Sequence, residues 1–170
     1  MEKMRRKLNI ALVAHDNRKV DMIDWVIYNS SFLAKHSLVC TGTTGTLIKE
    51  ALAKRDIHPD MQIMQSGPMG GDAEIAGMVV RKEIDLAVFL IDDLNAQPHE
   101  ADIMMLLRQC RVHNVPIACN RYSADLMITS NLWDDEDYSP MNPHYEVFDR
   151  EKHTSSLNKH ELDSKDELDS

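Results

Sequence analysis

Two glycine-rich segments carry the residue types that could bind an anion and move a proton. The first, CTGTTGT at residues 40–46, couples an apolar run to a helical pattern through two glycines and several threonines. Backbone amides at a helix start can surround a phosphate, and Thr41, Thr43 and Thr44 could add hydroxyl donors. The segment is neither a Walker loop nor GxGxxG. A plain helix N-cap with a tight turn is the alternative.

The second segment, SGPMGGD at residues 66–72, packs three glycines and a proline into seven residues. Such density predicts a backbone that approaches a ligand closely or adopts positive φ. Asp72 ends the segment and could take a proton from a ligand. A simple N-cap of a helix over residues 73–81 is the alternative for this aspartate. The density of glycine favours the functional interpretation.

Two histidines and a lysine complete this set. His99 starts a helical pattern, where the helix dipole disfavours an imidazolium and favours a neutral ring that can donate a hydrogen bond. Lys19 follows His15 by four residues and could supply positive charge, or remain a solvated surface lysine. A metal site built from His15, Asp16, Asp92 and His99 is conceivable, but no pair has a diagnostic spacing such as HExxH.

Five short, continuously apolar runs predict the strands that must position these side chains: residues 9–14, 37–41, 61–65, 85–90 and 116–119. Continuous hydrophobicity is typical of strands covered on both faces. Helical patterns such as residues 46–54 and 101–111 lie between them. The alternation predicts a mostly parallel sheet with helices on both sides. Ligands bind at the carboxyl ends of such strands, where nearly all the unusual polar residues collect.

Composition narrows the class of protein further. The 170 residues, 43% of them hydrophobic, suffice for one buried core. A net charge of -9 argues against a nucleic-acid surface or an anionic-membrane surface. The three cysteines show no CxxC spacing, which fits a reducing cytoplasm. No apolar run reaches the roughly 18 residues that cross a bilayer.

The chain divides into three parts on composition. Residues 1–8 are a basic leader, residues 9–150 are a single domain, and residues 151–170 are a polar tail that repeats ELDS. We expect the tail to be mobile, since it lacks the aromatic residues of a core.

The segments together resemble methylglyoxal synthase. The matching stretches are NIALVAHD with Lys19, TGTTG, SGPMGGD, DxLNAxPH with Asp102, and VPIACN followed by SAD, in order over residues 9–130. Any one of them is weak, but the combination is specific. The resemblance implies a three-layer α/β/α fold with a five-stranded parallel sheet.

The resemblance also implies an activity, the conversion of dihydroxyacetone phosphate into methylglyoxal and inorganic phosphate. It implies no metal, no organic cofactor, inhibition by phosphate and a homohexamer. By the same resemblance Asp72 is the catalytic base, His99 lies near the substrate oxygens, and Asp102 is a third active-site residue. The residues implied for substrate and phosphate binding are His15, Asp16, Lys19, Thr41, Gly42, Thr43, Thr44, Ser66, Gly67, Asp92 and, by a rough alignment, Arg150.

Two features leave alternatives open. Asp93 adds a carboxylate after the fourth strand, where relatives often have proline, so the shape of that loop is in question. The same fold also serves as a regulatory module of carbamoyl phosphate synthetases, which binds a phosphorylated effector without chemistry, and fold alone does not decide between them. Asp72 and His99 beside the phosphate-binding segment favour the enzyme.

Overall fold

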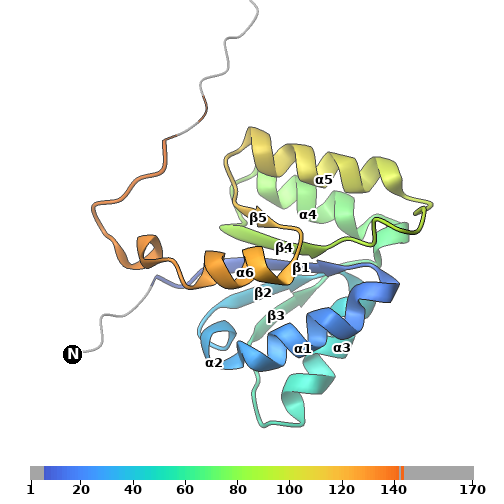
Figure 1. Ribbon diagram of the computed structural model, residues 1–170, viewed down its shortest axis with the longest axis horizontal. Helices are drawn as coiled ribbons and strands as arrows, with labels where there is room; N and C mark the ends of the chain where they lie inside the picture. Colours follow the sequence, from blue (N-terminus) through green and yellow to red (C-terminus); the bar gives the residue numbers. More distant parts are fainter. Residues whose placement is uncertain (1–5, 142, 144–170) are drawn as a thin grey trace, which may run out of the picture.

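Five parallel strands form one sheet in the order β3-β2-β1-β4-β5 (Figure 1). This computed structural model describes residues 6–141 and 143. The strands are β1 (Asn9–Ala14), β2 (Ser37–Cys40), β3 (Asp60–Ile63), β4 (Leu86–Leu90) and β5 (Ile117–Ala118). The central strand β1 pairs on both sides, with Ile10 opposite Leu38 of β2 and Leu86 of β4. The predicted parallel sheet is confirmed, and each strand overlaps the apolar run that predicted it.

Helices cover both faces of the sheet, which confirms the three-layer α/β/α fold. They are α1 (Lys19–Tyr28), α2 (Ser30–Leu33), α3 (Gly42–Ala53), α4 (Gly71–Val80), α5 (Glu100–Val112) and α6 (Arg121–Ile128), with short 3-10 helices η1 (Asp16–Arg18), η2 (Gly67–Met69) and η3 (Asn131–Asp134). In Figure 1 α4 and α5 lie above the sheet, and α1 and α3 lie below it. Helix α6 shares the hydrophobic core of α1 and α3. None of the helices within residues 6–141 is long and apolar enough to span a membrane.

Each face of the sheet has its own hydrophobic core, because successive strand residues point to opposite faces. On one side Leu12 and Val88 pack with Trp25 of α1 and Ile48 of α3. On the other side Phe89 of β4 packs with buried residues of α4 and α5. Strands buried on both faces explain why the sequence shows continuous rather than alternating apolar runs.

Two helices begin earlier than the sequence predicted. Helix α3 starts at Gly42, four residues before the expected start at Thr46, so the threonine segment forms its first turn. Helix α4 starts at Gly71, and its N-cap is Gly70 with φ of +98°. Asp72 is therefore the second residue inside α4, and the alternative in which it is the N-cap of this helix is wrong. The glycines that suggested loops instead permit a tight entry into each helix.

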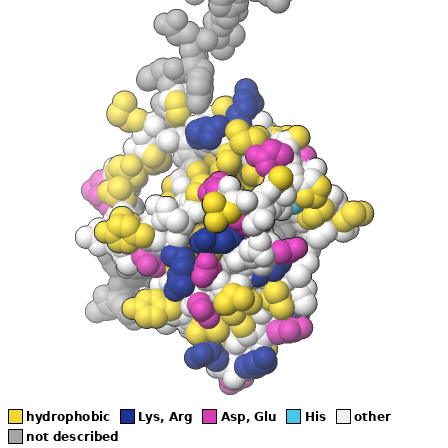
Figure 2. Space-filling view, turned by 45° about the vertical axis from the view of Figure 1, so that its right-hand side comes forward, with side chains coloured by type: hydrophobic (Ala, Val, Ile, Leu, Met, Phe, Trp, Pro, Cys, Tyr) yellow, Lys and Arg dark blue, Asp and Glu magenta, His cyan; other side chains and the backbone are white. Residues whose placement is uncertain are grey.

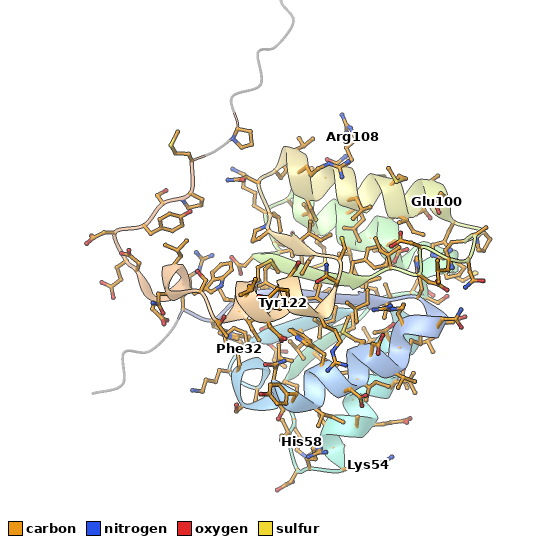
Figure 3. The ribbon with its side chains drawn as sticks, viewed as in Figure 1. Phe32, Lys54, His58, Glu100, Arg108 and Tyr122 are labelled. Atoms are coloured by element: carbon orange, nitrogen blue, oxygen red, sulfur yellow. The ribbon has the colours of Figure 1, made fainter. Side chains whose placement is uncertain are left out.

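The carboxyl ends of the strands lie together on the right-hand side of Figure 1. Helix α1 begins at this edge after η1, and α5 begins there at Glu100, which is labelled in Figure 3. The chain extends the sheet from β1 through β2 to β3, and then crosses back to add β4 and β5 on the other side of β1. Such a switch point opens a crevice at the carboxyl edge, where the candidate site lies.

Candidate active site

A cavity of about 230 Å³ lies at the carboxyl edge of β1, β2 and β3. Its volume is below that of pockets for drug-sized ligands, so it suits a small metabolite. The lining residues are Val13, Ala14, His15, Asp16, Lys19, Thr41, Thr43, Ser66, Gly67, Pro68, Asp72, Gln97 and His99. Figure 2 turns this side of the molecule forward and shows acidic and basic side chains interspersed rather than gathered by sign. Any selectivity for an anion must therefore come from the lining itself.

A larger hollow of about 350 Å³ lies elsewhere, over β3 and α4. It contains no histidine, and its arginine, Arg81, is already paired with Glu83 at 2.8 Å. The smaller cavity holds the groups that could do chemistry, so it is the candidate site.

Asp72 and His99 form the chemically active pair of the cavity. Nε2 of His99 lies 3.2 Å from Oδ2 of Asp72, and the side chains are 9% and 1% exposed. Burial raises the pKa of the Asp72 carboxyl; the charge of His99 opposes this shift and that of Asp102 adds to it. A carboxylate that has lost its water is a stronger base than an exposed one, which suits proton abstraction at neutral pH.

Gly67 forms the wall beside this pair. A Cβ atom at this position would lie 3.1 Å from Nε2 of His99 and 3.3 Å from Oδ2 of Asp72. A side chain there would crowd the reacting groups, so glycine leaves room for a ligand to reach them. Four residues later, position 71 must also be glycine, because a Cβ atom there would lie 2.0 Å from the carbonyl oxygen of Gln65.

Helix α3 and the turn after β3 form a cradle for an anion. Thr41 is the N-cap of α3 and Ser66 is the N-cap of η2, and neither side chain is used to cap its helix. The N–H groups in the first turn of an α-helix, such as those of Thr43 and Thr44, lack acceptors within the helix. Those free donors and the positive end of the helix dipole are what a phosphate needs.

Lys19 supplies positive charge next to the cradle. Its ammonium donates to the carbonyl oxygen of Ala14 at 3.2 Å and to Oδ1 of Asp16 at 2.6 Å. The hydrogen bond from Lys19 lowers the pKa of the Asp16 carboxyl, whose side chain is 95% exposed. Lys19 itself is mostly buried, so it is held at the cavity by two partners rather than solvated at the surface.

His15 lies between the core residue Phe89 and the active-site residue His99. The ring contacts Phe89 and His99 edge-on, with centroids 5.2 and 5.8 Å away. Its Nδ1 accepts the backbone N–H of Asp92 at 2.9 Å. Burial, followed by the charge of His99, lowers the pKa of His15. The ring is therefore neutral at physiological pH, with its proton on Nε2.

The structure brings together most of the residues that the sequence singled out. His15, Asp16, Lys19, Thr41, Thr43, Ser66, Gly67, Asp72 and His99 all line the cavity. Gly42, Thr44, Asp92 and Asp102 do not. The Thr44 hydroxyl donates to the carbonyl of Ala14, and Gly42 donates its N–H to Gln65, so both hold the cradle in shape. Arg150 and the tail lie outside the described residues.

One polar lining residue was missed by the sequence analysis. Gln97 reaches the cavity, and its side-chain amide donates to the carbonyl of Asn95 at 3.2 Å. Its position two residues before His99 was the available signal. The exposed Asp93 stays outside the lining, while the preceding Asp92 closes the loop by accepting the N–H of Leu94. Among residues 6–141 and 143, no three histidines, cysteines or carboxylates are grouped to hold a metal ion.

Fold and site together define an α/β protein with an anion cradle beside a buried carboxylate–imidazole pair. A family model described as the MGS-like domain matches residues 21–119. Methylglyoxal synthase from Treponema socranskii is 68% identical over 154 residues, covering 91% of this chain and 98% of the relative. The Coxiella burnetii (strain RSA 493 / Nine Mile phase I) protein of the same name is 43% identical, covering 82% and 93%.

Solved structures give the same result. The crystal structure of methylglyoxal synthase from Elizabethkingia anophelis NUHP1 superposes with a TM-score of 0.73 at 38% identity, covering 82% of this chain and 88% of that one. The chain belongs to the methylglyoxal synthase family.

Proposed function

We infer that this protein is a lyase that converts dihydroxyacetone phosphate into methylglyoxal and inorganic phosphate. The observation that carries the proposal is the buried Asp72–His99 pair, 3.2 Å apart, on the wall of a cavity that also contains an anion cradle. The high identity to methylglyoxal synthases over nearly the whole chain supports the same activity.

The first step is proton transfer from the hydroxymethyl carbon to the Asp72 carboxylate. The electrons of the broken C–H bond form a carbon–carbon double bond, and the carbonyl oxygen becomes an enediolate oxygen. His99 and His15 line the same cavity and can donate hydrogen bonds to the oxygens where this charge develops. Each donor aimed at such an oxygen contributes about 3–4 kcal/mol to transition-state stabilisation.

The second step is elimination of phosphate. The hydroxyl on the first carbon loses its proton to water and becomes the aldehyde carbonyl, the double bond shifts to the phosphate-bearing carbon, and phosphate leaves with the electron pair of the broken carbon–oxygen bond. The resulting enol tautomerises to methylglyoxal. Elimination requires that bond to stand roughly perpendicular to the enediolate plane. We propose that Lys19, Thr41, Thr43, Ser66 and Gly67 hold the phosphate in this rotamer, while Asp16 positions Lys19. The in-plane rotamer would instead allow reprotonation to an aldehyde phosphate.

Three further properties belong to this proposal. Inorganic phosphate inhibits by occupying the cradle. The protein assembles as a homo-oligomer, a hexamer by family resemblance. It works in the cytoplasm, consistent with free thiols at Cys40, Cys110 and Cys119.

A direct assay tests the activity. The purified protein, incubated with dihydroxyacetone phosphate and a metal chelator, should release phosphate and methylglyoxal in equal amounts. The chelator control separates this mechanism from metal-dependent hydrolysis, which would yield dihydroxyacetone and lose activity. Tight binding of the substrate without either product would overturn the proposal in favour of a regulatory module.

A further inference from the structure

The Asp92 carboxylate lies beside the cavity yet is fully engaged within the protein. Oδ2 accepts the side-chain amides of Asn17 and Asn95, each at 2.8 Å, and Oδ1 accepts the N–H of Leu94 at 3.1 Å. The residue is 8% exposed and is not part of the cavity lining. These bonds join the loop after β4 to η1, the turn that follows β1. They leave the carboxylate poorly placed to bind a substrate.

The backbone of the same residue controls His15. The N–H of Asp92 donates to Nδ1 of His15 at 2.9 Å in a buried setting. A nitrogen that accepts a hydrogen bond carries no proton, so the proton of the neutral ring is on Nε2. Nε2 is buried and has no partner among the described residues, while the His15 side chain lines the cavity. A donor without an acceptor is costly in a folded protein unless a ligand supplies the acceptor.

We propose that Asn17, Asp92 and Asn95 form a latch that holds His15 as the neutral Nε2–H tautomer and thereby presents a hydrogen-bond donor to a substrate oxygen. The identity of that oxygen, the carbonyl that becomes the enediolate, rests on the proposed function. The latch residues are positioning residues, because they act through His15 and do not line the cavity. Asp92 was predicted to bind the substrate itself; here it is assigned the role of orienting His15, which binds the substrate.

Burial is the largest influence that lowers the pKa of His15 and so favours its neutral ring. Lys19 on α1 and His99 at the start of α5 also disfavour an imidazolium, whereas Asp92 and Glu100 favour it. A protonated ring would also place a second N–H against that of Asp92. The latch carboxylate stays ionised, since its hydrogen bonds to Asn17 and Asn95 lower the pKa of Asp92.

The test compares Asp92→Asn with Asp93→Asn, which removes the same charge from the adjacent exposed residue. In protein labelled with 15N-histidine, a His15→Gln spectrum identifies the His15 signals. The parent protein should show an unprotonated Nδ1 and a protonated Nε2 at neutral and higher pH. Asp92→Asn should give signals averaged between the two tautomers, and kcat should fall about tenfold, as for other residues that orient an imidazole. Asp93→Asn should leave the spectrum unchanged and kcat within about twofold.

A milder variant guards against a change that disrupts the whole loop. Asn17→Ala removes one donor from an exposed position, and the averaged His15 signals should appear there in weaker form. Unaltered His15 signals in Asp92→Asn, or equal changes in Asp92→Asn and Asp93→Asn, would overturn the latch. The 15N NMR signals of His15 do not depend on turnover. A parent protein that shows the expected tautomer but has no lyase activity would therefore disprove the proposed function and leave the latch intact.

Discussion

Asp72 and Asp92 are two buried aspartates at the same edge of the sheet, and their surroundings differ in the number of hydrogen-bond donors. Asp92 receives two side-chain amides and one backbone N–H, and these bonds lower its pKa. Among the described residues no backbone N–H donates to Asp72; the imidazole of His99 lies 3.2 Å away, and burial raises the pKa of the Asp72 carboxyl. The difference teaches that burial alone does not define a base. A buried carboxylate is a stronger base when few hydrogen-bond donors stabilise its ionised form.

The largest expected effect is that of Asp72→Asn. The variant cannot accept the substrate proton, so kcat should fall by about 10²–10⁴-fold, the range typical of a general base. Binding of a phosphorylated enediolate mimic, measured by calorimetry, should be largely retained because the cradle is intact. The corresponding Asp92→Asn change, at about tenfold, provides the comparison. Equal loss of turnover and of mimic binding in Asp72→Asn would mean that this aspartate is structural.

Asp72→Asn and Asp92→Asn should shift the Tm of thermal unfolding in opposite directions. As pH rises through the raised pKa of Asp72, the folded protein must ionise a group that the unfolded chain ionises more easily, so the carboxylate lowers stability at pH 7. Asp72→Asn should therefore raise Tm at pH 7. Asp92 contributes stability above its ordinary pKa that is lost only as pH falls through its lowered value, so Asp92→Asn should lower Tm at pH 7.

The second largest loss of kcat is expected for Gly67→Ala, which changes the cavity wall beside Asp72. In Gly67→Ala the new methyl group would lie 3.1 Å from Nε2 of His99 and displace the reacting pair. Misplacement of this kind costs on the order of 100-fold in kcat. Gly77→Ala is the matched control, since its methyl meets only the flexible end of Arg81 and a helix gains about 0.5–1 kcal/mol from the change. Normal turnover in Gly67→Ala would show that the pair has more room than the distances indicate.

The smallest effect on activity is expected for Asp16→Asn, at the exposed aspartate on the carboxyl edge of the sheet. Asp16→Asn removes the ion pair with Lys19, whose ammonium is still held by the carbonyl of Ala14. Exposed ion pairs contribute about 0–1 kcal/mol, so kcat/KM should change by less than about fivefold, and less again in high salt. A loss comparable to that of Asp72→Asn would place Asp16 among the groups that touch the reacting atoms.

The sequence predicted the sheet well because its strands are buried on both faces. Each apolar run maps onto one strand, and the rule that parallel strands collect ligands at their carboxyl edge correctly grouped His15, Thr41, Ser66, Asp72 and His99. Helix starts were less predictable. Glycine favours turns on average, but in α3 and α4 it allows the chain to enter a helix against a neighbouring backbone.

The roles of individual carboxylates could not be predicted in the same way. Asp72 and Asp92 both lie in polar segments that follow strands, and only the folded structure shows that Asn17, far away in sequence, donates to Asp92. Gln97 was passed over because an uncharged amide is not an acid, base or nucleophile, and its position two residues before His99 was a weak signal. Hydrogen-bond partners that come from separate segments are set by tertiary structure rather than by local pattern.

The central position of β1 has a consequence for biosynthesis. Ile10 pairs with Leu38 on one side and with Leu86 on the other, so one edge of β1 stays open until much later codons are translated. The ribosome delivers Thr41, Ser66 and Asp72 before β4, and His99 only after it. A nascent chain can therefore build the anion cradle first, and it becomes a catalyst only when the second half closes the sheet.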